Sequence, residues 1–317
     1  MRSSVLLVPL VIGCTDRRYL DADCGDGHAV AGEACFGDER ETIAVAFTPV
    51  ATRVADFDGD DDVDVLVLGV DPVGGVTSSI AVNDGAGALA LPIAAGVVGC
   101  SAHPALGDAD VDGATDLLVA TCESSMWIYR AEGDASFAPP IAVDVGALPR
   151  TSGIVDIDGD ALPDVVVLGI IGDAAVLTWA RGQGALAWAS PTVDVVGTVG
   201  HPDDPTAFSI AQLDDDAIAD AVLSHAAPDV PPLLVRGAPD GFGAPEPWDE
   251  LPVALGVAAI DLDGREDAEL VAITDGGDTI EVYRGRFGSL KRVGTTDISG
   301  QRGRLLAVGD IDGDRRL

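Results

Sequence analysis

The sequence is poor in positive charge. It has 18 Lys and Arg against 53 Asp and Glu, which gives a formal net charge of −35. Nucleic acid is therefore excluded as a partner, because binding it depends on neutralising phosphates with Lys and Arg. Aromatic residues are also scarce, at 4%, and acidic chains with few aromatics are often disordered. Disorder is nevertheless not expected here, since 47% of the residues are hydrophobic and they fall in Val, Leu and Ile runs.

Long apolar runs and helical periodicity are missing as well. No segment after the N-terminus reaches the roughly 18 uninterrupted apolar residues that a transmembrane helix needs. No window holds apolar residues at helical spacing for three turns. Runs of four to eight residues rich in Val, Ile, Tyr and Trp instead alternate with Gly, Asp and Pro clusters, which is typical of strands and hairpins. The sequence therefore predicts an all-β fold.

Catalytic motifs are absent from the sequence. It contains no G-x-S-x-G elbow, no H-E-x-x-H helix and no Walker loop. None of the four histidines lies in a motif that specifies a role, and Ser224-His225 is interpreted as a pair just after a strand. The tryptophans are expected at exposed positions of outer strands, where packing between strands is favoured over a platform for sugars: Trp127, Trp179, Trp188 and Trp248. No enzymatic activity is expected.

What the sequence does contain is a repeated acidic turn of nine residues. The best copy, Asp156–Asp164, has carboxylates at its first, third, fifth and ninth positions and is flanked by apolar segments. The pattern starts again, intact or degraded, at Asp56, Asp108, Gln212, Asp261 and Asp310, with spacings of 48 to 56 residues.

A period near fifty residues indicates an array of repeats, and four short strands per period make one propeller blade. The predicted fold is therefore an all-β propeller of four-stranded antiparallel blades. It has five complete repeats plus the start of a sixth, and it occupies residues 41–317.

The spacing of the carboxylates predicts calcium binding. Calcium is a hard cation that takes six to eight oxygens, and carboxylates at alternate positions of a tight loop can converge on one ion. Asp-Gly sequences also form ordinary hairpin turns, but such turns do not require Asp at four fixed positions together. The predicted ligands are Asp56, Asp58, Asp60, Asp62 and Asp64; Asp108, Asp110, Asp112 and Asp116; Asp156, Asp158, Asp160 and Asp164; Gln212, Asp214, Asp216 and Asp220; and Asp310, Asp312 and Asp314.

The copies are not equivalent. The first three turns are complete and predict three strong sites. The fourth begins with Gln212, whose amide oxygen predicts a weaker site. The fifth has Arg265 in place of a carboxylate, and its guanidinium could replace the ion, so that this turn is expected to be empty. The sixth is cut short, because the sequence given stops at Leu317, before the ninth position.

These turns, together with Gly-rich turns such as Phe242-Gly243-Ala244-Pro245, resemble the FG-GAP/VCBS repeat family. The resemblance covers residues 41–317 and implies a β-propeller with calcium loops, as in the head of integrin α chains. Members of the family serve in adhesion, in carbohydrate binding and as accessories to enzymes, so the resemblance does not fix an activity. The family usually closes seven blades, and a ring with five blades and part of a sixth is expected to be incomplete.

The N-terminus is interpreted as a targeting segment. Arg2 precedes an apolar stretch that ends in Val11-Ile12-Gly13-Cys14, which resembles a bacterial lipobox. The expected organisation is a signal peptide at residues 1–13, a lipid on Cys14 and a tether at residues 14–40. The protein is thus expected to be exported as an outer-membrane or cell-surface lipoprotein, with secretion as the alternative.

The other four cysteines form an even number, which favours disulfides in an exported chain. Cys24 and Cys35 frame a short Gly-rich stretch, and a zinc site there is disfavoured because His28 is the only histidine nearby. Cys100 and Cys122 flank the second acidic turn, and the alternative to a disulfide is two free thiols.

Two functions follow from the sequence. The first is a non-enzymatic, calcium-stabilised and surface-tethered propeller that binds an extracellular protein or glycan. The second is an enzyme or an accessory module in polysaccharide breakdown, with its site in the propeller channel. Histidines or carboxylates that converge outside the acidic turns would favour the second.

Overall fold

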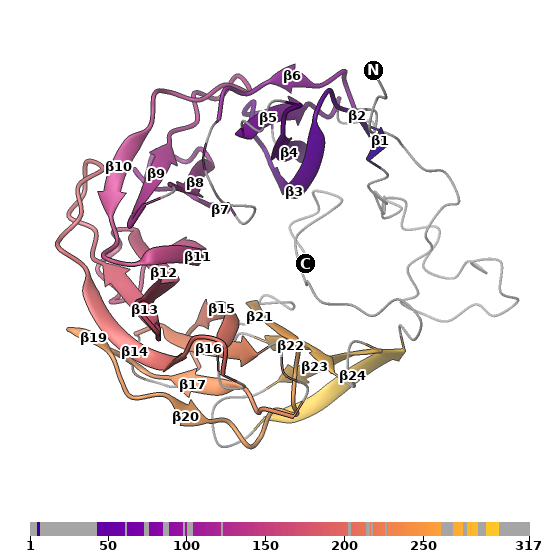
Figure 1. Ribbon diagram of the computed structural model, residues 1–317. Coiled ribbons are helices and arrows are strands. Elements are labelled where there is room, and N and C mark those ends of the chain that lie inside the picture. The colour runs from indigo at the N-terminus through magenta and orange to yellow at the C-terminus, as the bar shows by residue number, and fades with distance from the viewer. Residues whose placement is uncertain are drawn as a thin grey trace, which may run out of the picture. The chain divides into compact units, whose positions relative to one another are not determined.

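The computed structural model describes residues 5–6 and 43–297, apart from 61, 73–75, 85–88, 98, 100–103, 122, 202–203, 214–215, 217, 226, 228, 261–268, 275–277 and 285–289. Every regular element in this part of the chain is a β-strand (Figure 1). None of the described residues belongs to a helix that is long and apolar enough to cross a membrane. The strands form five four-stranded antiparallel sheets, which confirms the five predicted blades of a β-propeller.

The strands follow one another along the chain within each blade. The first blade contains β3 (Thr48–Ala55), β4 (Asp64–Val70), β5 (Val76–Ala81) and β6 (Ile93–Ala94); the second contains β7 (Ala105–Gly107), β8 (Asp116–Ala120), β9 (Ser125–Tyr129) and β10 (Ile141–Asp144); the third contains β11 (Leu148–Val155), β12 (Asp164–Ile171), β13 (Ala174–Ala180) and β14 (Thr192–Thr198); the fourth contains β15 (Pro205–Ala211), β16 (Asp220–His225), β17 (Leu233–Val235) and β20 (Glu246–Pro247); and the fifth contains β21 (Gly256–Ile260), β22 (Glu269–Thr274), β23 (Thr279–Arg284) and β24 (Lys291–Asp297).

Two short pairs lie outside the blades. Strand β1 (Val5–Leu6) pairs with β2 (Ile43–Ala44), and β18 (Gly237–Ala238) pairs with β19 (Gly241–Phe242). The chain divides into two compact units. Unit 1 includes the first blade and the hairpin of residues 131–137, and unit 2 includes the strands of the other four blades.

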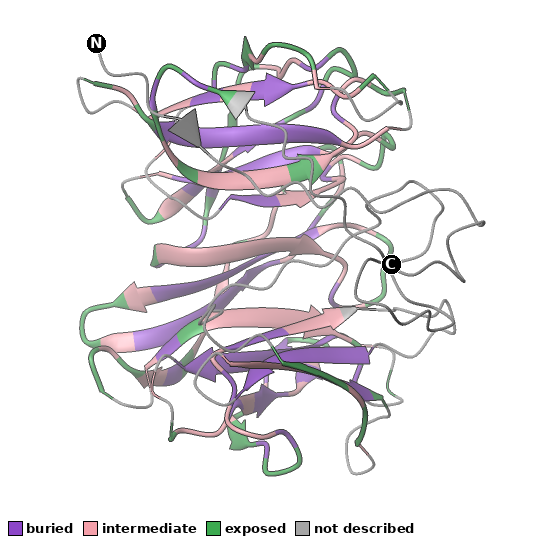
Figure 2. Ribbon diagram, turned by 90° about the vertical axis from the view of Figure 1, so that its right-hand side faces the viewer, coloured by how far each residue is buried: buried purple, intermediate pink, exposed green. Residues whose placement is uncertain are grey.

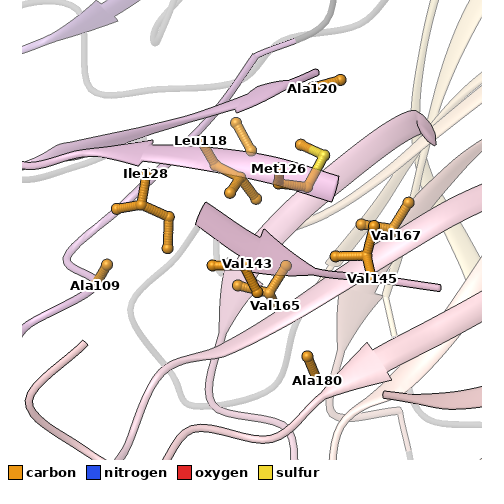
Figure 3. Packing of buried hydrophobic residues seen from close by; sticks show 11 residues of the cluster. Ala109, Leu118, Ala120, Met126, Ile128, Val143, Val145, Val165, Val167 and Ala180 are labelled. Carbon is orange, nitrogen blue, oxygen red and sulfur yellow. The ribbon is translucent and has the colours of Figure 1, made fainter. Parts of the chain in front are cut away.

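The second strand of each blade is buried along most of its length (Figure 2). In unit 2, alternate residues of β12 face different neighbours, as the period of two along a strand requires. Val165 and Val167 pack in one cluster with Leu118 of the second blade (Figure 3). Val166 and Leu168 pack in another cluster with residues of the fourth blade. A strand with both faces covered explains why these runs are continuously apolar in the sequence.

The first strands of the four blades in unit 2 contact one another in chain order, β7 with β11, β11 with β15 and β15 with β21. The approach of β7 to β11 is close, because a Cβ added to Gly107 would lie 2.7 Å from Cβ of Ile154. Between β15 and β21, the hydroxyl of Ser209 accepts a hydrogen bond of 2.8 Å from Ala259 N. Neighbouring blades are thus joined along their first strands as well as through their faces.

A β-bulge recurs near the start of the first strand in three blades. The register shifts between Pro49 and Ala51, between Pro149 and Thr151, and between Pro205 and Ala207. The extra residue of the third blade is Arg150, whose guanidinium binds both carboxylate oxygens of Asp204, with N–O distances of 2.5 and 3.1 Å. A bulge re-aims the side chain of its extra residue, and here it directs Arg150 to that carboxylate.

Two expectations about side chains need correction. Trp179 and Trp248 are only 2% and 1% exposed, so they are core residues and do not lie at the surface, while Trp127 and Trp188 are half-buried. His225 is not in a loop after its strand, because it forms the buried end of β16 beside buried Ser224. Trp179 and Trp248 pack in clusters that join two blades, a burial that the sequence of a single blade does not reveal.

Candidate metal centre in the acidic turns

In the first four turns the ninth carboxylate is the first residue of the second strand, and it is buried. One of its oxygens accepts a hydrogen bond from the backbone N–H of the second position, and this contact closes the turn. The N–O distances are 2.9 Å for Phe57 and Asp64, 2.8 Å for Ala109 and Asp116, 2.9 Å for Ile157 and Asp164, and 3.2 Å for Leu213 and Asp220.

The other oxygen of this carboxylate reaches the second residue after the third strand. Asp164 accepts a hydrogen bond of 2.7 Å from Gly182 N, and Asp220 one of 2.9 Å from Gly237 N. Asp64 accepts the equivalent bond of 2.8 Å from Asn83 N. The approach leaves no room for a side chain at Gly182, where an added Cβ would lie 2.4 Å from Pro163 O. The ninth carboxylate therefore ties the turn to the second and third strands.

Burial raises the pKa of Asp64 and of Asp164, although their hydrogen bonds from backbone N–H groups oppose the shift. A buried carboxylate with two backbone donors is held in one orientation. The sequence predicted this residue only as a metal ligand. Its structural role could have been anticipated from its place at the start of the most apolar strand.

The first carboxylate of each of the first three turns accepts backbone hydrogen bonds from within the same loop. Asp56 accepts one of 2.7 Å from Gly59 N, Asp108 one of 2.9 Å from Gly113 N, and Asp156 one of 2.9 Å from Gly159 N. These glycines have φ values of +81°, +92° and +74°, a region that side chains disfavour, which explains why glycine recurs in the turns. The loop is thus folded around its first carboxylate.

The third carboxylate completes a cluster in each of the first three turns. One oxygen from each of the first, third and ninth positions lies within 4.8 Å of the other two: Asp56, Asp58 and Asp64; Asp108, Asp110 and Asp116; Asp156, Asp158 and Asp164. The Oδ1 atoms of Asp58 and Asp110 are buried and have no hydrogen-bond partner among the described residues. Burial and the neighbouring carboxylates raise the pKa of both groups.

The geometry of these clusters fits calcium. Oxygens that bind the ion at about 2.3–2.6 Å are at most about 5 Å apart across it. The oxygens of each cluster meet that limit, and the two orphaned oxygens offer lone pairs to a cation. Buried acceptors left without a partner are costly, and a bound cation would remove that cost.

The carboxylates at the fifth position are not part of these clusters. Asp60, Asp112 and Asp160 are exposed, and each accepts a hydrogen bond from the backbone N–H two residues later, at 3.0, 2.8 and 2.9 Å. The first of these donors is the N–H of Asp62, which the sequence also predicted as a ligand. The fifth position therefore stabilises the loop in the structure as described.

Parts of the prediction lie outside the described residues. In the fourth turn Asp214 is among them, while Gln212 and Asp216 are exposed and Asp220 is buried. The fifth turn at residues 261–268, including Arg265, and Asp310, Asp312 and Asp314 of the sixth are also outside. The same holds for Cys14 and for both predicted disulfides, Cys24–Cys35 and Cys100–Cys122, so these remain predictions.

An arginine beside the turns was missed by the sequence analysis. It lies at the equivalent register position in four of the five blades, directly after the third strand at Arg130, Arg181 and Arg236 and as its last residue at Arg284, whereas the first blade has Val82 there. Arg181 Nε lies 2.9 Å from Asp158 Oδ2, and Arg130 Nη1 lies 3.8 Å from Asp110 Oδ2. In the fifth blade Arg284 Nε donates to Glu269 Oε1 at 2.8 Å. Aligning the repeats beyond the acidic turn would have revealed this arginine.

The first and third turns also contact a hairpin from the following blade. In unit 1, Ala135 N donates a hydrogen bond of 2.9 Å to Phe57 O, and Phe137 packs edge-on against Phe57 with ring centroids 5.9 Å apart. In unit 2, the second position of the third turn, Ile157, packs in one cluster with Phe242 of the fourth blade. The acidic turns are therefore part of the contacts between successive repeats.

The fold is a β-propeller in which an acidic turn precedes the buried second strand of the blade. The FG-GAP-like repeat family matches residues 108–167, from the second acidic turn into the second strand of the third blade. This match and the five blades together confirm the resemblance of the sequence to FG-GAP repeat β-propellers. No curated protein matches the chain.

Solved structures with similar folds have little sequence identity to the chain. A candidate 6-phosphogluconolactonase from Bacteroides uniformis has a TM-score of 0.51 at 11% identity, over 86% of this chain and 76% of that one. The lectin of Aleuria aurantia in complex with Fucα1-6GlcNAc has a TM-score of 0.49 at 10% identity, over 87% and 88%. Rhamnogalacturonan lyase YesW has a TM-score of 0.45 at 13% identity, over 90% and 53%. These similarities concern the fold alone.

Proposed function

We propose that the protein is a calcium-binding β-propeller that is exported, tethered to the cell surface by a lipid on Cys14, and binds an extracellular protein or glycan without catalysing a reaction. The observation that carries the calcium proposal is the set of three carboxylate clusters with oxygens within 4.8 Å of one another. The buried and unpartnered Oδ1 atoms of Asp58 and Asp110 support it.

Calcium would have a structural role in these turns. The residues that would hold it are the first, third and ninth carboxylates of each cluster. The ninth already joins the turn to two strands through its backbone hydrogen bonds, so an ion bound to it would stabilise the entire start of the blade. It would also neutralise three carboxylates that otherwise repel one another at short distance.

The three sites would differ in affinity because of the arginine that follows the third strand. The first turn faces Val82, so that no guanidinium competes at this position for Asp58. In the third turn, Arg181 forms an ion pair with Asp158 at 2.9 Å. A bound calcium ion would repel this guanidinium and would have to displace it from Asp158. The second turn is intermediate, because Arg130 remains 3.8 Å from Asp110. We therefore expect the first turn to bind calcium most tightly.

A binding protein is favoured over an enzyme by the first strands of the blades in unit 2. The described strands β7, β11, β15 and β21 contain no carboxylate and no histidine. Their one charged side chain, Arg150, is paired with Asp204. A catalytic site would need acid, base or nucleophilic groups that converge. A role as an accessory module in polysaccharide breakdown remains the second candidate.

Calcium removal tests the proposal. Extracellular calcium sites commonly bind at ~10⁻⁴–10⁻³ M, and at tenfold excess over Kd each site stabilises the folded state by about 1.4 kcal/mol. The melting temperature of the full chain should therefore fall in excess chelator and recover on addition of calcium. The variant Asp58→Asn should lose part of this difference, whereas Asp144→Asn, an exposed site away from the clusters, should keep it. A melting temperature that is equal with calcium and with chelator would contradict the proposal.

A further inference from the structure

The backbone of Val111, the fourth residue of the second acidic turn, lies in the left-handed region, with φ at +63°. The fourth residue of the first and third turns has a similar conformation, but there it is a glycine, Gly59 at +81° and Gly159 at +74°. A β-branched residue in this region is strained, because its Cβ is crowded by the following carbonyl oxygen. The second turn therefore keeps the same shape as the other two at a higher conformational cost.

Packing offsets little of this strain. The side chain of Val111 is 61% exposed. It lines a cleft of about 220 Å³ together with residues 161–163 of the third turn and the hairpin of residues 182–188 that follows β13. A rotation of the backbone at Val111 would thus displace no buried side chain, and the cleft leaves room for it.

The hydrogen bonds of the first carboxylate do not hold this residue in place either. In the first and third turns that carboxylate accepts a bond from the N–H of the fourth residue, at 2.7 and 2.9 Å. In the second turn Asp108 accepts its bonds from Asp112 N at 3.1 Å and Gly113 N at 2.9 Å, the fifth and sixth residues. The bonds to Asp108 therefore begin one residue after Val111.

The following blade also binds the second turn less firmly than the other two. At the second position of the first turn, Phe57 O accepts a hydrogen bond of 2.9 Å from Ala135 N, and in the third turn Ile157 O accepts one of 2.8 Å from Ala219 N. Within the third blade, none of the described residues donates to the carbonyl at this position of the second turn. The residue that corresponds to Ala219 is Pro163, which has no N–H. The second turn is thus the one that can change shape without breaking such a bond.

We propose that Val111 makes the second turn the calcium-responsive one: without the ion the strained loop relaxes at Val111, and calcium holds it in the conformation described. A rotation at Val111 turns the neighbouring peptide and carries Asp110 away from Asp108 and Asp116, with which it forms a cluster. Because only the strained conformation gathers these oxygens, a bound ion shifts the population toward it. The inference rests on the proposed calcium binding and adds which turn changes shape and which residue causes the change.

The residue at this position should therefore set the apparent calcium affinity of the turn. That affinity falls in proportion to the fraction of chains in which the site is formed. The usual penalty for a side chain in the left-handed region changes such a fraction by roughly 5- to 30-fold. Asn tolerates the region better, because its short side chain forms local hydrogen bonds. Val111→Asn should thus lower the calcium concentration at half-saturation by roughly 3- to 10-fold, with the charge of the turn unchanged.

Hydrogen exchange measured by mass spectrometry on the full chain tests the inference, because peptides from different turns are read separately. In excess chelator we expect the amides of residues 109–114 to exchange about tenfold faster, or more, than in saturating calcium chloride, and those of the third turn to change less. Val111→Asn should reduce this difference and shift the midpoint of a calcium chloride titration as stated. Gly159→Val, the reverse change, should make the third turn more dependent on calcium.

Val195→Asn is the matched control, because Val195 is similarly exposed, at 63%, but lies in the extended strand β14. It should leave the exchange of every turn unchanged. A second turn that responds to calcium no more than the third, or an unchanged midpoint in Val111→Asn, would overturn the inference and leave calcium binding intact. If calcium chloride alters neither the exchange of any turn nor the melting temperature, calcium binding and the inference fail together.

Discussion

The guanidinium of Arg181 lies 2.9 Å from the carboxylate of Asp158, the third position of the most complete acidic turn. The same side chain stacks over the ring of Trp179, at 4.9 Å from its centroid. The third turn thus carries a cation of its own, held by an ion pair and by an aromatic face. Whether this cation competes with calcium can be measured directly.

Replacing Arg181 by Met should raise the calcium affinity of the third turn. Ion pairs of partly exposed groups contribute at most about 1 kcal/mol, but the positive charge also repels the incoming ion, so an increase of roughly 3- to 10-fold is expected. Titration calorimetry with calcium measures it. Arg292→Met is the control, because Arg292 pairs with Glu281 in the fifth blade. An affinity that stays the same or falls would show that Arg181 does not compete.

The reverse change belongs in the first blade. Val82→Arg places a guanidinium where four other blades have one, and it should lower the calcium affinity of the first turn by a similar factor. The position is half-buried next to Asn83, so the fold should tolerate a long side chain whose charged end reaches solvent. A tighter site in this variant would contradict the competition of arginine with the ion.

The ninth carboxylates should matter for stability even without calcium. Asp164→Asn replaces an oxygen that accepts a backbone hydrogen bond by an amide that donates, so one buried N–H of Ile157 or Gly182 loses its partner. A loss of about 2–4 kcal/mol in the free energy of unfolding is expected from urea denaturation in excess chelator. Asp160→Asn, at the exposed fifth position, should cost less than about 0.5 kcal/mol. Equal effects of the two changes would be inconsistent with this role.

The contact of Phe137 with Phe57 should couple the following repeat to the first turn. Phe137→Ala removes a half-buried ring that packs edge-on against a fully buried one, and we expect a loss of about 2–3 kcal/mol. Because Phe57 lies between Asp56 and Asp58, the same change should also weaken calcium binding at this turn. Phe137→Leu, which keeps most of the apolar volume, should lose less of both. Unchanged calcium affinity in Phe137→Ala would show that packing and ion binding are independent.

The Arg150–Asp204 pair predicts a loss of stability in acid. Burial alone would raise the pKa of Asp204, but the hydrogen bonds from Arg150 and Gly200 N and the charge of Arg150 outweigh it and hold the pKa below the ordinary value. The pair therefore stabilises the fold above the unfolded pKa of about 3.9, and this contribution is lost as the pH falls through the lower folded pKa. Asp204→Asn should remove about 1–3 kcal/mol at pH 7 and flatten the pH dependence below pH 4, as measured by urea denaturation at each pH. A parallel decline in both proteins would assign the acid sensitivity to other groups.

The blade architecture and much of the site could be predicted from the sequence, because a blade repeats its pattern. The carboxylates at the first, third and ninth positions lie at a fixed spacing in the sequence. In each of the first three turns the structure brings these three side chains together in one cluster. The fifth position could not be separated from them, since it differs only in the direction that the loop backbone gives it.

Contacts between residues far apart in the chain, within a blade or between blades, were beyond the sequence. Arg181 reaches Asp158 because the end of the third strand returns to the turn, a proximity that depends on the register of β12 and β13. Ala109 packs in the cluster that Trp188, 79 positions later, also joins, and nothing local in the sequence marks this contact. The burial of Trp179 likewise comes from packing with residues of the fourth blade.

The hairpin that packs on an acidic turn always comes later in the chain than the turn itself in the two contacts described. Phe57 packs against Phe137, which is 80 residues further on, and Ile157 packs in one cluster with Phe242, which is 85 residues further on. A chain is made from its N-terminus at roughly 5–20 residues per second. The acidic turn of one blade therefore stays uncovered for several seconds, until the hairpin of the next blade has been made. A substitution that disrupts the hairpin of one blade should therefore destabilise first the acidic turn of the preceding blade.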